Sequence, residues 1–300
     1  MIIVKMMGGL GNQLFQYAYA LSLAKEYNEE ILFDTSAYPE EHQLTIYKFN
    51  VPKHRNWEEV FGPEERAKIV KEQKKYRVLQ KAKRVLLRTE ELGNAWFKKN
   101  MGKGHYFNFD PYYYPMQKTE KTNKYIYGYF QSEKYFENCK ELISELYTFP
   151  VPLSQKAEEI KNLIKEENSV AIHIRLGDYK KLRNHYLDVC TQKYYKNAME
   201  YIAQNEETPR FFVFTNDAEE VKKIVRLPEN AIIVEGTKDY EDFELIRECK
   251  HAIISNSTFS WWAAYLNDNT NKRVVAPTPW FTTLKKEADI YWNEMIKLEV

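Results

Sequence analysis

Short apolar segments alternate with helical segments along almost the whole chain, and this alternation limits the fold more than any other feature of the sequence. The chain opens with an apolar strand at residues 2–6, a helix at 14–27 and a second strand at 31–34, which is a βαβ arrangement. A helix at 63–89 and a strand at 125–130 follow, and this strand leads into a helix that begins near Ser132. Since alternating strands and helices build parallel sheets, we expect an α/β fold with helices on both faces.

Two prolines, Pro150 and Pro152, mark the boundary between two predicted domains, 1–150 and 151–300. The pattern of the second domain predicts strands at 170–174, 211–215, 231–235, 252–255 and 274–276, and helices at 154–166, from 218, at 240–249, at 261–266 and at 283–290. The last of these helices could pack back on the first domain. The aromatic run at 105–114 has no clear period, so we assign it neither secondary structure nor binding residues.

Composition and charge exclude several classes of protein. The 44 lysines and arginines nearly balance 43 acidic residues, so the net charge of +1 predicts no general attraction to nucleic acid or anionic lipid. The three cysteines are far apart and form no zinc-like spacing, which favours a reducing compartment. No run approaches the roughly 18 apolar residues of a membrane span, and the first residues lack a signal-peptide pattern. We therefore expect a cytoplasmic protein without an anchoring helix.

The first candidate site is the sequence GGLGNQ, which follows the first strand. Small residues at such a turn let backbone amides approach an anion, and the dipole of the next helix favours that anion. We therefore take Gly9, Gly11, Asn12 and Gln13 as candidate ligand-binding residues, since the two amide side chains are also suited to sugar hydroxyls. The alternative is that the glycines only form a tight turn.

A nicotinamide-dependent sugar-nucleotide oxidoreductase or epimerase is a rival hypothesis for the same segment. Asp34 lies roughly where the ribose-binding acid of a dinucleotide enzyme would lie. Leu14 counts against this hypothesis, because it stands where a third glycine would permit close packing of the helix. Asp34 could instead cap the chain that follows it.

The second candidate site is the sequence HIRLGDY, at the end of a buried strand. Ligands of open α/β sheets bind at the carboxyl ends of the strands, and the alternation of a strand points His173 and Arg175 to one face. Arginine is a fixed, always charged fork for phosphate oxygens. Gly177 allows a turn, after which Asp178 presents a carboxylate. Alternatively, Arg175 and Asp178 only form an ion pair, and His173 only makes a structural hydrogen bond.

The third candidate site combines the ends of two further strands. Asn216 and Asp217 follow the strand at 211–215, where Asp217 could accept hydrogen bonds from a nucleoside or could cap the next helix. A hydroxyl-rich loop then precedes a helix and forms a second cradle for an anion, made of Ser255, Asn256, Ser257, Thr258 and Phe259. Two anion-binding loops, this one and GGLGNQ, would suit a pyrophosphate. The tryptophans that follow are better suited to the core than to contact with a ligand.

Four segments, GGLGNQLFQYA, GYFQSEKYF, HIRLGDY and SNSTFSWWAAYL, together resemble the α-1,2-fucosyltransferases of glycosyltransferase family 11. The resemblance spans almost the entire chain in the expected order. It implies two Rossmann-like domains in a GT-B arrangement with a donor cleft between them. GDP-fucose would be held mainly by the C-terminal domain, and the acceptor would approach from the N-terminal one.

The resemblance also implies an activity and residue roles. The chain would transfer L-fucose from GDP-fucose to the 2-hydroxyl of a terminal galactose, with inversion and without a metal or other cofactor. Arg175 would grip the β-phosphate, Ser257, Thr258 and Phe259 would complete the phosphate and nucleoside site, and Asn12 would face fucose and the acceptor hydroxyl. Many members carry a second arginine where this chain has Leu176. We take Asp178 as the candidate general base.

Ten basic residues and one acid, Glu72, lie between Arg66 and Arg88, interleaved with apolar residues. The simpler interpretation is a solvated helix with its apolar side on the core. The alternative is peripheral contact with a membrane that carries a lipid-linked acceptor. A non-catalytic glycan- or RNA-binding module is the second rival to a transferase.

Overall fold

The computed structural model describes residues 1–39, 44–87, 92–176, 189–282, 284 and 286–300. Within them the chain forms two compact units, Met1–Thr148 and Phe149–Val300, and each is described by itself. In these residues no helix has the length and apolar character that a bilayer crossing requires.

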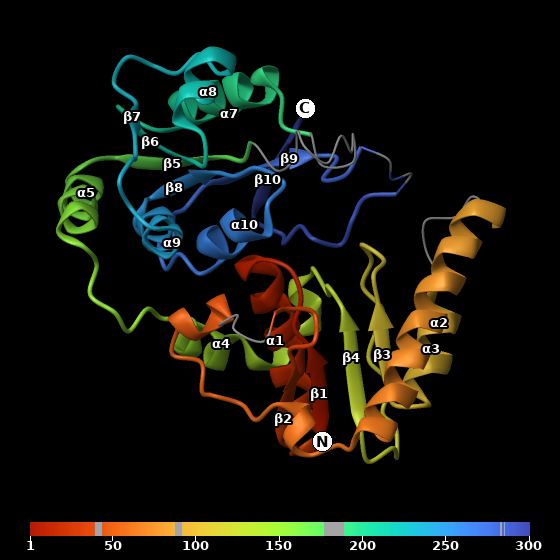
Figure 1. Cartoon of the computed structure of the whole chain (residues 1–300). Helices are drawn as coiled ribbons and strands as arrows, with labels where there is room; N and C mark the ends of the chain where they lie inside the picture. Colours follow the sequence, from red (N-terminus) through yellow and green to blue (C-terminus); the bar gives the residue numbers. More distant parts are fainter. Residues whose placement is uncertain (40–43, 88–91, 177–188, 283, 285) are drawn as a thin grey trace. The chain divides into compact units, whose positions relative to one another are not determined.

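The first unit is built on a four-stranded parallel sheet with the strand order β2-β1-β4-β3 (Figure 1). Its elements are β1 Ile2–Lys5, α1 Leu10–Tyr27, β2 Ile31–Asp34, η1 Thr45–Lys48, η2 Trp57–Glu59, α2 Pro63–Leu87, α3 Asn94–Met101, β3 His105–Asn108, β4 Lys124–Gly128, η3 Glu133–Tyr135, η4 Glu137–Cys139 and α4 Lys140–Leu146.

Both faces of this sheet are covered, and neighbouring residues of β3 show how. The ring of Tyr106 lies 6.2 Å from that of Tyr19 on α1, between ring centroids. The next residue, Phe107, packs on the other face, 5.6 Å from Tyr76 of α2. Successive side chains of a strand point to opposite faces of the sheet. The aromatic residues of β3 therefore pack into the core on each face of the sheet and do not form an exposed surface.

The second unit contains a six-stranded parallel sheet with the order β10-β9-β8-β5-β6-β7. Its elements are α5 Gln155–Glu166, β5 Ser169–Ile174, α7 Gln192–Asn205, β6 Arg210–Thr215, α8 Ala218–Ile224, β7 Ile232–Ile233, α9 Asp239–Glu248, β8 His251–Ile253, α10 Thr258–Tyr265, β9 Val274–Thr278 and β10 Met295–Glu299. Figure 1 shows α7 and α8 on one face of the sheet and α5, α9 and α10 on the other.

Numbered within this unit alone, the strands run 3-2-1-4-5-6, which is the order of a doubly wound dinucleotide-type fold. The direction of the strand order reverses between the first strand, β5, and the fourth, β8. A crevice forms at such a reversal, outside the carboxyl ends of the two strands, and ligands of this fold class bind there. The topology therefore selects the residues that follow β5 and β8 as the centre of a site.

The structure corrects several expected elements. The helix expected at 283–290 is absent from the described residues of that segment, and the chain goes on to the unexpected strand β10. Ala288, Ile290 and Trp292 are buried there, and the indole nitrogen of Trp261 donates to the Ile290 carbonyl oxygen at 2.8 Å. Burial of these apolar side chains outweighs the helix propensity of the segment.

A second correction concerns the glycine turn. The first helix begins at Leu10, four residues before the expected start, because the Gly9 carbonyl already accepts from the amides of Asn12 and Gln13 at 3.0 and 3.1 Å. Gly11, Asn12 and Gln13 are therefore helical residues, and only Gly8 and Gly9 form the turn.

Candidate active site

Two segments of the second unit that were predicted as separate sites meet at the reversal point of its sheet, namely the end of β5 and the start of α10. His173, the fifth residue of β5, is 6% exposed, and its Nδ1 lies 2.9 Å from the Ser255 hydroxyl oxygen. The centroid of its ring lies 5.6 Å from that of the Phe259 ring. Residues of the predicted second and third sites therefore lie together, joined through this histidine.

The loop between β8 and α10 is buried although it is polar. Ser255, Asn256 and Ser257 are 1%, 5% and 6% exposed, and Thr258 and Phe259 are partly exposed at the start of the helix. The Ser257 side chain makes no capping hydrogen bond. The first turn of a helix has amides without intrahelical partners and a positive dipole end, so the start of α10 is suited to an anion at the reversal point.

Arg175 follows β5 directly and is partly exposed. The backbone next to it is fixed by Asn216, whose side-chain oxygen accepts from the Leu176 amide at 2.9 Å and whose side-chain nitrogen donates to the Leu176 carbonyl at 2.8 Å. This two-point clamp ties the end of β5 to the end of β6. Asn216 thus has a positioning role that the sequence pattern did not reveal.

Asp217 caps α8, since its carboxylate accepts from the Glu220 amide at 3.0 Å. This is one of the two roles expected for it. Asp178, the candidate base, lies outside the described residues. Both tryptophans at 261 and 262 are fully buried, which confirms that they belong to the core.

In the first unit the reversal of strand order falls between β1 and β4, and Asn12 lies at this point. Its side-chain oxygen accepts from the Gln131 side chain at 2.9 Å, and Gln131 follows β4. Asn12 alone among residues 11–13 is partly exposed. Gln131 was not among the predicted site residues, although the same carboxyl-end rule that selected Arg175 would have found it after the expected strand at 125–130.

Gln13, in contrast, is an internal brace of the turn. This residue is 1% exposed. The side-chain nitrogen donates to the Gly8 carbonyl and lies 3.0 Å from the Tyr38 hydroxyl oxygen, and the side-chain oxygen accepts from the Ile46 amide. Gly8 has a φ of 76°, and a Cβ there would lie 2.7 Å from the Asn12 side-chain nitrogen. The turn therefore needs glycine at position 8 so that Asn12 can lie close to the backbone.

Asp34 is also used internally. It is 1% exposed, one carboxylate oxygen accepts from the Ser36 amide at 3.0 Å, and the other lies 3.2 Å from the Lys5 ammonium group. A buried, paired carboxylate does not present itself to a ribose, so this arrangement counts against the dinucleotide hypothesis.

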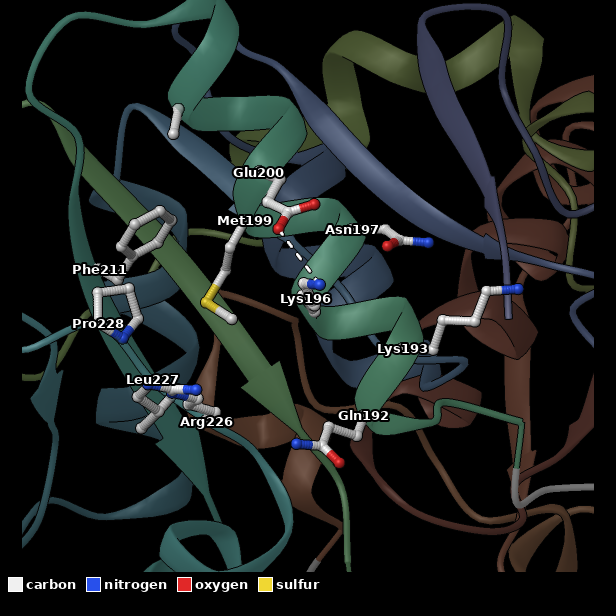
Figure 2. A pocket seen from close by; sticks show the side chains of 11 residues that line it. Gln192, Lys193, Lys196, Asn197, Met199, Glu200, Phe211, Arg226, Leu227 and Pro228 are labelled. Atoms are coloured by element: carbon white, nitrogen blue, oxygen red, sulfur yellow. Dashed lines mark ion pairs between the residues drawn. The ribbon is translucent and has the colours of Figure 1, made fainter.

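A separate pocket of about 890 Å³ lies along α7 (Figure 2). The residues that line it come from α7, the amino end of β6 and the chain after α8, and they are Gln192, Lys193, Lys196, Asn197, Met199, Glu200, Ala203, Phe211, Arg226, Leu227 and Pro228. None of the predicted site residues is among these eleven. The large pocket is thus distinct from the reversal point.

His173 is expected to stay neutral and to make stability depend on pH. Burial first, and then the nearby positive charge of Arg175, lower the pKa of His173 to about 3. The unfolded chain takes up this proton near pH 6.5, so the free energy of unfolding falls as the pH drops from about 6.5 towards 3. At about pH 5 the expected loss is about 2 kcal/mol, at roughly 1.4 kcal/mol for each pH unit.

The variant His173→Gln tests this prediction, because its amide can still pair with Ser255 but cannot titrate. Urea unfolding of both proteins near neutral pH and near pH 5 gives the measurement. The wild type should lose about 2 kcal/mol more than the variant on acidification, since the other histidines contribute equally to both. Equal losses in the two proteins would contradict a neutral, buried His173.

A model of the family described as glycosyl transferase family 11 matches residues 1–299. The chain belongs to this family. Both the resemblance to the α-1,2-fucosyltransferases of family 11 and the predicted class of enzyme, a glycosyltransferase, are thereby confirmed.

Two curated relatives match this family 11 chain over most of its length. An α-1,2-colitosyltransferase of Escherichia coli is 29% identical, over 93% of this chain and 92% of the relative. The O-antigen biosynthesis glycosyltransferase WbnK, also of E. coli, is 26% identical, over 91% and 93%.

Among solved structures, the fucosyltransferase NodZ from Bradyrhizobium is similar with a TM-score of 0.50 and 14% sequence identity, over 88% of this chain and 91% of that chain. At this identity the likeness shows the fold alone. It agrees with the two parallel sheets described above, so the predicted α/β class with two Rossmann-like parts is confirmed. The predicted donor cleft between the two parts stays a prediction.

Proposed function

We propose that this family 11 enzyme transfers L-fucose from GDP-β-L-fucose to the 2-hydroxyl of a terminal galactose, with inversion and without a metal. The observation that carries the proposal is the junction of β5 with α10, where an arginine and a helix N-terminus flank the reversal point of a doubly wound sheet. In this proposal the second unit binds the donor, the first unit binds the acceptor, and the protein acts in the cytoplasm on a free or lipid-linked glycan.

The main chemical task is to stabilise the departing GDP. As the bond between fucose and phosphate breaks, positive charge grows on the sugar ring and negative charge on the β-phosphate. The guanidinium of Arg175 can donate two hydrogen bonds to phosphate oxygens, and the amides at the start of α10 add a dipole of the right sign. Such preorganised donors are each worth roughly 3 kcal/mol of barrier.

The remaining predicted residues have supporting roles in this proposal. His173 is neutral and orients Ser255, while Asn216 fixes the backbone beside Arg175. Ser257, Thr258 and Phe259 complete the phosphate and nucleoside site. Asn256 and Asp217 line it, although the Asn256 side chain also donates to the Trp280 carbonyl at 3.3 Å and Asp217 also caps α8.

In the first unit we assign Asn12 to fucose and the acceptor hydroxyl, with Gln131 holding the Asn12 side chain. Gly9 lies at the exposed start of α1, where its backbone can approach a ligand, and Gly11 is buried in the first turn of that helix. Because all described hydrogen bonds of Gln13 are internal, we propose that it positions the turn and does not touch a ligand.

Asp178 is the proposed general base on the acceptor 2-hydroxyl, and Asp178→Asn is expected to lower turnover by about 100-fold or more. Its position three residues after Arg175 in the sequence supports this role. Transfer rates with saturating donor give the measurement, and Glu219→Gln, an exposed residue of α8 outside the proposed site, is a control for the removal of a carboxylate. Near-native transfer by Asp178→Asn would refute the role.

The names of similar proteins support parts of the proposal. The NodZ structure was also determined with GDP, and the E. coli relatives are named for α-1,2 transfer of colitose and for O-antigen biosynthesis. A polysaccharide acceptor and an α-1,2 linkage therefore fit this chain as well. Colitose is L-fucose without its 3-hydroxyl, so GDP-fucose and GDP-colitose are the two donors to compare.

The test is incubation of the protein with labelled GDP-fucose or GDP-colitose and a panel of galactose-ended oligosaccharides, followed by linkage analysis of the product. We expect α-1,2-linked fucose on galactose, with activity retained in EDTA. Preferred transfer of colitose would overturn the donor assignment. Failure to transfer or hydrolyse either donor would favour a non-catalytic glycan-binding module, and a strong loss in EDTA would contradict a metal-independent mechanism.

A further inference from the structure

The long helix α2 has a core side that is defined by its buried residues. Gln73, Tyr76 and Gln80 are 5%, 4% and 3% exposed, and Ile69 packs against the hydrophobic cluster that contains Tyr76. These positions follow each other at intervals of four, three and four residues, which is one face of a helix. These residues define the side of α2 that packs against the first unit.

Specific contacts hold the C-terminal half of α2 in place. The Gln80 side chain donates to the Asp110 carboxylate at 3.1 Å, Lys83 donates to the Leu92 carbonyl at 2.7 Å, and the Arg77 guanidinium lies 4.0 Å from the centre of the Phe109 ring. The orientation of the helix about its axis is therefore fixed, and so is the face that it turns to solvent.

That solvent face carries large apolar side chains. Val78, Val85 and Leu86 are 67%, 70% and 78% exposed, and Leu79 is 38% exposed. Val78 follows Tyr76 by two residues, which is about 200° around a helix, so it lies opposite the core. Of the seven exposed large apolar side chains in the described part of the chain, these four lie within nine residues of one helix, and such a gathering marks an interaction surface.

Lysines surround these apolar side chains. Lys71, Lys74, Lys75 and Lys81 are all exposed, and no acidic residue follows Glu72 on α2. Figure 1 shows α2 at the side of β3 and α3, on the edge of the first unit. An apolar stripe within a basic face is the pattern of a helix that lies on an anionic lipid surface, where the aliphatic parts of lysine also contribute.

We propose that the solvent face of α2, formed by the exposed lysine, valine and leucine side chains named above, docks this enzyme on an anionic membrane surface. The inference goes beyond the proposed function, because it requires no particular donor or acceptor. A second copy of the same face is a poor partner, since it would set lysines against lysines. Nucleic acid would leave the valines and leucines unburied, whereas the interface of a bilayer takes up both the apolar and the basic side chains.

Vesicle flotation of the full chain tests the proposal. The wild type should float with vesicles of phosphatidylcholine and phosphatidylglycerol, and less so at high salt or with phosphatidylcholine alone. Each lysine near such a surface changes partitioning about fivefold, so Lys71→Gln/Lys74→Gln/Lys75→Gln should lower it at least tenfold. Val78→Gln/Val85→Gln/Leu86→Gln should also lower it at least tenfold, through lost burial of apolar groups.

A matched control removes similar groups elsewhere, with Leu142→Gln on α4 and Lys156→Gln and Lys165→Gln on α5. It should float like the wild type. All variants should transfer sugar to a soluble acceptor at the wild-type rate, so loss of flotation and loss of activity are separate results. Wild-type protein that stays at the bottom of the gradient, or α2 variants that float unchanged, would overturn the proposal; so would self-association through α2 without flotation.

Discussion

Arg175→Ala is expected to lower the turnover of sugar transfer by about 100- to 1000-fold, which corresponds to roughly 3 to 4 kcal/mol of barrier. Arg175 directly follows β5, which borders the reversal point, and Asn216 holds the backbone of the next residue, Leu176. Its loss removes the only arginine proposed to meet the growing charge on the β-phosphate, since Leu176 supplies no second one. Steady-state rates with saturating donor and acceptor give the measurement.

Arg175→Lys and Arg226→Ala complete this experiment. Lysine keeps the charge but lacks the planar fork, so Arg175→Lys should recover only part of the activity. Arg226 is an exposed arginine of the same unit that lines the separate pocket along α7, and Arg226→Ala should transfer sugar at the wild-type rate. Near-native turnover by Arg175→Ala would refute the phosphate clamp.

Gly128→Ala is expected to destabilise the first unit by about 3 kcal/mol or more. A Cβ at this position would lie 1.7 Å from the Asn108 carbonyl oxygen, which belongs to the paired strand β3. The obstacle is backbone, and φ is 156°, so no side-chain rotation can relieve the clash. Urea unfolding followed by circular dichroism gives the free energy.

Gly62→Ala is the matched control, because nothing lies within 4 Å of a Cβ built there. It should change the free energy of unfolding by less than about 0.5 kcal/mol. Recovery of Gly128→Ala only as insoluble protein, beside soluble Gly62→Ala, would agree with the expectation. A Gly128→Ala protein as stable as the wild type would show that β3 and β4 can move apart at little cost.

Much of the fold follows from periodicity in the sequence. Strands β1, β2, β5 and β6 are short apolar runs between turns, and each lies within one residue of its expected position. Such runs are reliable because a central strand of a parallel sheet is buried on both faces. The order of the strands, in contrast, depends on long-range pairing that no local pattern records.

Two strands that escaped prediction have less distinctive patterns than the strands that were predicted. In β3 the sequence HYFN puts aromatic side chains on both faces, so no alternation is visible. The edge strand β10 is half exposed and mixes lysine with leucine. Helix α7 did have a signal, since Tyr194, Tyr195, Ala198, Met199 and Ile202 are buried at helical spacing.

The candidate site was partly predictable, because the predicted strands also indicate where their carboxyl ends lie. The carboxyl-end rule selected His173, Arg175 and the loop at 255–259 from sequence alone. It did not predict that His173 would bond to Ser255 or that Asn216 would clamp Leu176, since both contacts join segments 40 or more residues apart. The internal role of Gln13 was also hidden, because its partner Ile46 lies 33 residues away.

A crystal of the protein soaked with GDP tests the central claim most directly. We expect the diphosphate at the carboxyl edge of the second sheet, with its β-phosphate on the Arg175 guanidinium and its oxygens near the backbone of Thr258. A nucleotide bound in the pocket along α7, or anywhere else remote from both residues, would contradict the proposed donor site.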